Sequence, residues 1–211
     1  EPLDIAAIAA ALGDLARRFD IDVLAECDST NTRLMAMAET GAPSGSVLAA
    51  EQQTAGRGRR GRSWLSTSGN SLTFSLVWRF PHDTALDGLS LAVGVALARG
   101  LESIGIGGIA LKWPNDVLLD GRKLAGILIE LAPGPRPEAA VIGIGLNLRL
   151  PQDLPEELSA TVAALCDVGG ELPSRNVLLA QLLRALHEQL VDFTRHGFSG
   201  ARTAWLAHHA Y

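Results

Sequence analysis

The residues best suited to chemistry are four arginines and three glycines in one short segment, GRGRRGR at positions 56–62. Glycine lets backbone N–H groups approach a ligand closely, and arginine binds a phosphate or carboxylate through two parallel hydrogen bonds. The segment therefore predicts a site for an anionic small molecule. A solvated basic loop or an RNA-binding arginine–glycine tract has a similar composition. A single copy between strands, in a chain of net charge −5, favours the small-molecule site.

A second charged segment surrounds Lys123, which opens the otherwise apolar stretch KLAGILIE at 123–130 and follows KWPND at 112–116. A buried ammonium group is costly unless an anion compensates it, so a ligand carboxylate or phosphate is a natural partner. The alternative is that Lys123 extends from the strand edge into solvent. Asn115 and Asp116 suit a turn, and Asp116 can also help to hold Mg²⁺ through water.

A third segment, VIGIGLNL at 141–148, combines bare backbone with a polar end. Strand alternation places Gly143, Gly145 and Asn147 on one face. Such a face permits close approach by a ligand, although a bulge or tight packing against a helix gives the same pattern. The glycines do not complete a G-x-G-x-x-G turn, which argues against a Rossmann nucleotide site. The histidines show no metal-ligand spacing, and no activated nucleophile is evident.

Hydrophobic periodicity predicts the elements that must position these residues. Helices are expected over residues 5–19, 31–39 and 86–104, and in the segment after 148 up to about His196; Asp28, Ser29 and Thr30 supply N-cap chemistry for the second. Strands are expected over residues 22–27, 47–52, 72–79 (one buried face), 109–113, 117–119, 123–131 and 139–148. Asp120 and Gly121 predict a hairpin turn, and residues 133–137 a loop. The order predicts an α+β fold with a mixed, largely antiparallel sheet backed by helices.

The composition predicts a soluble globular protein of one main domain. The chain has 211 residues, of which 47% are hydrophobic, and it has no long apolar run. No membrane association is expected. The acidic net charge argues against general nucleic-acid binding. Cys27 and Cys166 lie far apart without metal-ligand spacing, and no signal-peptide pattern is present, which predicts the reducing cytoplasm.

Five motifs together resemble the biotin protein ligase family in order and spacing: Ser29-Thr30-Asn31, GRGRRG at 56–61, KWPND at 112–116, KLAG at 123–126 and GIGLN at 143–147. The resemblance covers residues 25–150 and implies the class II synthetase-like catalytic domain of biotin and lipoate ligases. The implied activity joins biotin to ATP as biotinyl-5′-adenylate, releases pyrophosphate, and transfers biotin to a lysine of a biotin carboxyl carrier protein. A lipoate or octanoate ligase of the same fold is the alternative.

The resemblance also implies roles for individual residues. Lys123 and Arg59 are the expected catalytic residues. The residues expected to bind biotin are Ser29, Thr30, Asn31, Gln53, Gly56, Arg57, Gly58, Arg59, Lys123, Gly126, Gly143 and Gly145. Those expected to bind ATP or the adenylate are Arg59, Arg62, Trp64 (by stacking on adenine), Lys112, Asn115 and Asn147, with Mg²⁺ accompanying the triphosphate near Asp116.

The same resemblance carries expectations about organisation. We expect one catalytic domain over residues 1–211, without an N-terminal helix-turn-helix and with the small C-terminal β-barrel of longer members absent or truncated. DNA binding is therefore not expected, and a homodimer is compatible with the sequence. The arginine–glycine loop is expected to be mobile without ligand and to close over biotin and the adenylate.

Overall fold

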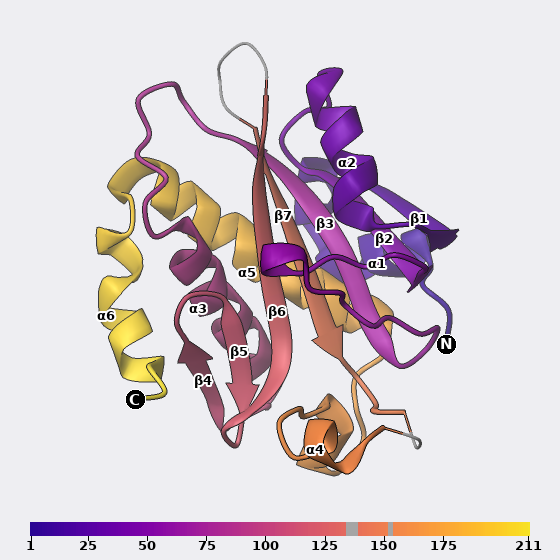
Figure 1. The fold of residues 1–211 in the computed structure, drawn as a ribbon. Helices are drawn as coiled ribbons and strands as arrows, with labels where there is room; N and C mark the ends of the chain where they lie inside the picture. Colours follow the sequence, from indigo (N-terminus) through magenta and orange to yellow (C-terminus); the bar gives the residue numbers. More distant parts are fainter. Residues whose placement is uncertain (134–138, 152–153) are drawn as a thin grey trace.

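A seven-stranded sheet forms the centre of the molecule in a computed structural model, which describes residues 1–133, 139–151 and 154–211 (Figure 1). The strand order is β1-β2-β3-β7-β6-β5-β4. Strands β1 and β2 are parallel, and the other neighbouring strands are antiparallel. This arrangement confirms the predicted α+β fold. The strands are β1 (Asp20–Cys27), β2 (Ser46–Gln53), β3 (Ser71–Arg79), β4 (Ile109–Lys112), β5 (Asp116–Leu119), β6 (Arg122–Ala132) and β7 (Ala139–Asn147).

Helices cover one face of the sheet and bury the main core against it (Figure 1). They are α1 (Ile5–Leu12), α3 (Leu89–Glu102) and α5 (Arg175–His196), and α6 (Ser199–His208) packs against α3 and β4. Phe74, Phe80 and Phe193 lie in this core with at most 1% of their surface exposed. Burial of each such side chain contributes about 1.5–3 kcal/mol to folding. This core makes the sheet a rigid floor for whatever lies on its other face.

The opposite face is only partly covered by a helix, α2 (Thr30–Glu39). Leu34 of α2 packs on Leu48, Val77 and Val141 in a second, smaller apolar cluster. Strand β3 is therefore buried on both faces along most of its length. The prediction of one buried face was wrong for β3, because its polar alternate residues are covered by α2 and by the segment that follows β2.

Local sequence signals set several element ends. Ser29 caps α2 by accepting a hydrogen bond from the Thr32 N–H at 3.4 Å, which confirms the N-cap prediction. Asp120 and Gly121, with φ of 49° and 77°, form the predicted hairpin turn. The first helix is shorter than predicted, because the chain turns at Gly13 (φ 61°) and continues as the 3₁₀ helix η1 (Gly13–Arg18).

The last part of the chain is more helical than predicted. Two short elements, α4 (Glu156–Ser159) and η3 (Leu165–Val168), precede α5, and α6 extends the helical region beyond His196. The loop predicted at 133–137 falls almost entirely outside the described residues. Among the helices that the structure describes, none is long and apolar enough to span a bilayer.

Candidate active site

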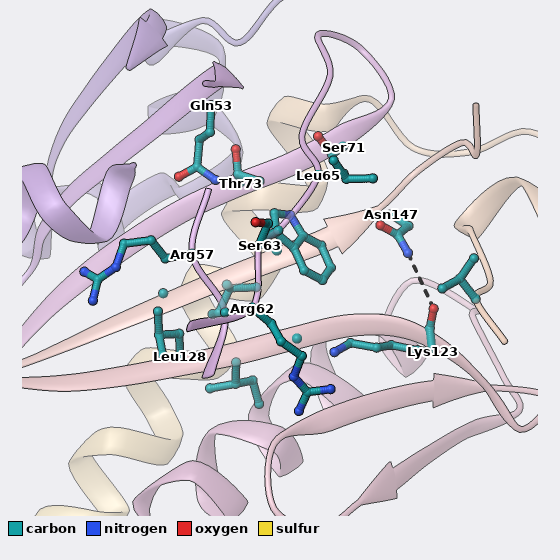
Figure 2. Close-up of a pocket in the computed structure, with 18 of the residues that line it drawn as sticks. Gln53, Arg57, Arg62, Ser63, Leu65, Ser71, Thr73, Lys123, Leu128 and Asn147 are labelled. Atoms are coloured by element: carbon teal, nitrogen blue, oxygen red, sulfur yellow. Dashed lines mark hydrogen bonds between the residues drawn. The ribbon is translucent and has the colours of Figure 1, made fainter. Parts of the chain in front are cut away.

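A cavity of about 370 Å³ opens on the sheet face formed by β3, β7 and β6 (Figure 2). The segment between β2 and β3 covers part of it, and residues that follow β7 close another side. Of the residues predicted to form the site, Gly56 and Lys112 are not in its lining. The predicted residues that do line it are Ser29, Thr30, Asn31, Gln53, Arg57, Gly58, Arg59, Arg62, Trp64, Asn115, Asp116, Lys123, Gly126, Gly143, Gly145 and Asn147.

At the end of the cavity beside α2, uncharged polar groups form a hydrogen-bonded network. Gln53 Oε1 accepts hydrogen bonds from the N–H of Thr30 at 2.7 Å and from its hydroxyl at 3.1 Å. The Ser75 hydroxyl lies 2.8 Å from the Thr30 hydroxyl and 2.7 Å from Asn31 Oδ1. Thr30 and Asn31 are each 3% exposed, so these groups are held in place by packing as well. This end is suited to an uncharged polar group of a ligand.

The arginine–glycine segment folds back on itself as an irregular hairpin. The Gly56 carbonyl accepts from the Trp64 N–H at 2.8 Å, and the Gly58 N–H donates to the Arg62 carbonyl at 2.6 Å. The 3₁₀ helix η2 (Arg59–Gly61) forms its tip. A Cβ at Gly56 would collide with the Trp64 carbonyl, so this glycine serves the hairpin itself. The predicted mobility of the segment without ligand stays a prediction.

The indole of Trp64 lies against the bare backbone of β6 and β7. A Cβ at Gly145 would lie 2.5 Å from Trp64 Nε1, and one at Gly126 would lie 3.2 Å from Cζ3. These two glycines are direct partners in the sheet, so together they leave room for one ring. Trp64 Nε1 is buried without a hydrogen-bond partner among the described residues. The indole is thus part of the cavity wall, and its stacking on adenine stays a prediction.

Positive charge gathers at the other end of the cavity. Lys123 Nζ lies 2.8 Å from Asp116 Oδ1 and 5.7 Å from the Trp64 ring centroid. Arg59 Nη1 donates to Asn115 Oδ1 at 3.2 Å, and the amide of Asn115 is itself tied to β6. A single carboxylate faces several cations here, so the net field favours an anionic ligand.

Asn147 and the chain after α4 brace the start of β6. Asn147 Nδ2 donates to the carbonyls of Lys123 at 3.4 Å and Ala163 at 3.0 Å (Figure 2). The Lys123 N–H also donates to the Thr161 carbonyl at 2.9 Å. These bonds fix the backbone from which the Lys123 ammonium extends. A contact of Asn147 with ATP stays a prediction.

Lys112 lies outside the cavity, near the Tyr211 ring. Its Nζ lies 5.8 Å from the centroid of the Tyr211 ring, and the residue is exposed. The proline turn after β4 sends Asn115 and Asp116 into the cavity but leaves the preceding lysine outside its lining. An ATP contact by Lys112 therefore stays a prediction.

Several residues in or beside the site were not predicted from the sequence. Ser75 is one of the polar residues that alternate with apolar ones along β3, and the alternation pattern placed it on the face that was not expected to be buried. Glu130 ends the KLAGILIE stretch and binds Arg57 through two hydrogen bonds, at 2.6 and 3.1 Å. Apolar residues of the cavity wall had no sequence signal, because they lie in the loops and the short helix α4 that follow β7. They are Leu150, Pro151, Leu154, Leu158 and Val162.

The described residues fit a magnesium ion only as a companion of phosphate. Asp116 is the one carboxylate among the described residues of the lining, and no cluster of three metal-binding side chains is found among the residues that the structure describes. Mg²⁺ commonly keeps several waters and binds through one or two carboxylates plus substrate phosphates. Asp116 suits that mode of binding.

The sequence matches the biotin/lipoate A/B protein ligase family over residues 23–147. The chain belongs to this family. The matched residues run from β1 to the end of β7 and so include the polar network, the hairpin, Lys123 and the glycines of β7. The recognised motifs and most of the cavity lining therefore lie in the part of the chain that the family model matches, while the wall residues between 149 and 162 follow it.

Proteins of this family that are similar to the chain in sequence and structure include biotin ligases. It is 39% identical to the biotin–[acetyl-CoA-carboxylase] ligase of Paracoccus denitrificans, over 88% of this chain and 79% of that protein. It is also 39% identical to the bifunctional ligase/repressor BirA of Escherichia coli strain K12, over 88% of this chain and 58% of BirA. A biotin protein ligase from Aquifex aeolicus, solved with biotin and ATP, superposes with a TM-score of 0.78 at 32% identity, covering 91% of this chain and 79% of that one.

The chain spans little more than half the length of the first curated relatives it matches. It covers 57% of the Bacillus subtilis BirA and 58% of the Escherichia coli protein. Likeness to these ligases therefore concerns the region described above.

Proposed function

We propose that this ligase-family chain activates biotin with ATP and transfers it to a lysine of a biotin carboxyl carrier protein. The observation that carries the proposal is the division of the cavity. One end presents a fixed array of uncharged hydrogen-bonding groups, with the nearby Arg57 paired to Glu130. The other end presents the cations Lys123 and Arg59, and glycine backbone lies between the two ends. Biotin has a ureido ring at one end and a carboxylate at the other, so the two ends of the molecule match the two ends of the cavity.

In the first step the biotin carboxylate attacks the α-phosphorus of ATP, and pyrophosphate leaves with the electrons of the broken P–O bond. Two anions must approach, and fixed positive groups relieve this repulsion and stabilise the transition state. Lys123 and Arg59 would supply that charge, because both line the cationic end and both are held by neighbours, Asp116 and Asn115. Magnesium would neutralise the departing phosphates, with Asp116 as its protein contact through water.

In the second step an acceptor lysine, as the free amine, attacks the acyl carbon of biotinyl-5′-adenylate, and AMP leaves. The mixed anhydride must be kept from water until the amine arrives. The hairpin covers one side of the cavity, and Leu154, Leu158 and Val162 supply an apolar wall on another. These groups would shield the anhydride while leaving an approach for the acceptor side chain.

The described cysteines are consistent with the predicted reducing compartment, since Cys27 and Cys166 form no disulfide. We propose the cytoplasm as the place of action on this ground. The acceptor is proposed from its chemistry, a carrier domain that presents an accessible lysine.

The test is acid-dependent exchange of pyrophosphate into ATP. Biotin is expected to support the exchange, and octanoate and lipoate are expected not to. Their alkyl chain or dithiolane ring offers no hydrogen-bond donor to the array of Ser29, Thr30 and Asn31. If lipoate or octanoate supports pyrophosphate exchange and biotin does not, the substrate is one of these fatty acids and the proposed biotin activity is wrong.

A second assay addresses the arginine–glycine hairpin. Tight, salt-sensitive RNA binding without any response to biotin would favour an RNA-binding module. Because Arg57, Arg59 and Arg62 all line the cavity, we expect weak RNA binding and calorimetric heat with biotin instead.

A further inference from the structure

Glu130 joins three parts of the site that are far apart in the sequence. It lies on β6, and its carboxylate binds the guanidinium of Arg57 on the hairpin, with Nη2–Oε1 at 2.6 Å and Nη1–Oε2 at 3.1 Å. The same carboxylate accepts a hydrogen bond from Asn31 Nδ2 at 3.0 Å, at the start of α2. The sheet, the helix and the hairpin therefore meet at one side chain, which does not itself line the cavity.

The contact with Asn31 decides which way its amide faces. An ionised carboxylate only accepts hydrogen bonds, so the Asn31 group beside Glu130 must be the Nδ2 donor. The second Nδ2 hydrogen points to the Leu128 carbonyl at 3.3 Å. Asn31 Oδ1 is left facing Ser75 and the bare backbone of Gly143, where a Cβ would collide with it. The amide thus offers the cavity an acceptor beside the Ser75 hydroxyl, which suits a donor such as an N–H on the ligand.

The contact with Arg57 decides where the hairpin rests. Two parallel hydrogen bonds between a guanidinium and a carboxylate fix both distance and orientation. The pair is partly exposed, with 48% of the Arg57 side chain and 24% of the Glu130 side chain accessible, so its attraction is moderate. A moderate contact can hold a flexible segment closed and still release it in each catalytic cycle.

We propose that Glu130 is a positioning residue that fixes the Asn31 amide as an acceptor for a ligand N–H and anchors Arg57 so that the hairpin stays closed over that ligand. The proposal rests on the proposed function, because it names the part of biotin, a ureido N–H, that this end of the site selects. It makes closure of the hairpin and selection of the head group depend on the same carboxylate.

The test compares Glu130→Gln, Glu130→Ala and Arg57→Gln in the full chain by pyrophosphate exchange and by release of labelled biotinyl-adenylate from the protein. Glu130→Ala is expected to raise the KM for biotin about tenfold or more while kcat changes by less than about threefold, since the lost group does not touch the reacting atoms. Glu130→Gln keeps an oxygen acceptor for Asn31 and is expected to raise the KM less. Both variants should release the adenylate several-fold faster than the wild type.

A second measurement separates positioning from general loss of structure. The wild type should use biotin methylated on a ureido nitrogen far less well than biotin. Glu130→Ala should bring the two rates closer together, because the Asn31 Nδ2 group then keeps only its longer hydrogen bond, at 3.3 Å to the Leu128 carbonyl, and the amide is less firmly oriented. A double-mutant cycle should show that Arg57→Gln adds little to adenylate release once Glu130→Gln is present. Arg33→Gln is the matched control, because it removes a guanidinium from another exposed ion pair, Arg33–Asp28 at 2.8 Å, outside the cavity lining.

The outcomes distinguish this inference from the proposed function. Exchange with biotin by the wild type, together with unchanged KM, selectivity and adenylate release in the Glu130 variants, would overturn the inference alone. Fully additive effects of Arg57→Gln and Glu130→Gln would overturn the anchoring of the hairpin. A wild type that fails to use biotin would overturn the proposed function itself.

Discussion

Lys123→Ala is the change that most directly tests the electrostatics of the site. The mutation removes the ammonium that lies 2.8 Å from Asp116 and leaves that carboxylate facing the ligand without a partner. Loss of one preorganised donor to a developing charge typically costs about 10²- to 10³-fold in rate, or about 3–4 kcal/mol. We therefore expect adenylate formation to fall by about 10² or more.

Part of this loss should come from Asp116 and not from the missing lysine. Two like charges about 5 Å apart in an effective dielectric of about 20 repel by roughly 3 kcal/mol, and the open cavity lowers this value. Asp116→Asn in the Lys123→Ala background removes this repulsion. The double variant should therefore form adenylate about tenfold faster than Lys123→Ala alone, a gain smaller than the full repulsion energy would allow. Asp116→Asn alone should not raise the rate, because Lys123 already neutralises this carboxylate in the wild type and no uncompensated repulsion is removed.

The assay is single-turnover formation of labelled biotinyl-adenylate at saturating ATP and biotin. Urea unfolding is the control, and it should change little because 32% of the Lys123 side chain is exposed. A near-wild-type rate for Lys123→Ala would remove this residue from the mechanism. A double variant as slow as the single one would show that Asp116 does not oppose the ligand.

Three further predictions concern packing and pH. Gly145→Ala should impair biotin binding by tenfold or more in calorimetry, because the new Cβ would lie 2.5 Å from Trp64 Nε1 and must displace the indole. Phe74→Ala, at a fully buried position, should lower the free energy of unfolding by about 3–5 kcal/mol in urea titrations. Burial lowers the pKa of His208, but hydrogen bonds to a backbone carbonyl and Glu102 outweigh it, and the pKa is raised above 6.5. The stability that this group adds should therefore be complete below pH 6.5 and be lost as the pH rises through the raised pKa, so His208→Gln should lower the Tm at pH 6 more than at pH 9.

Local signals in the sequence determined most of the elements. Alternating apolar residues marked the central strands, and the Ser29 cap and the Asp120-Gly121 turn were read correctly because each acts through its nearest neighbours. The first helix was predicted too long, since a single glycine with positive φ ended it. The two-sided burial of β3 was missed, because alternation describes one strand and contains no information about what covers its polar face.

The sequence by itself also supplied the chemical groups of the site, since arginine, lysine and glycine motifs in fixed order carry the resemblance to the ligase family. Their pairing was decided only by the tertiary structure. Lys123 meets Asp116 across a hairpin, the indole of Trp64 fills the space above paired glycines, and Glu130 reaches both Arg57 and Asn31. Strand order and register set these contacts, and both are fixed by burial summed over the whole sheet, which no short motif encodes.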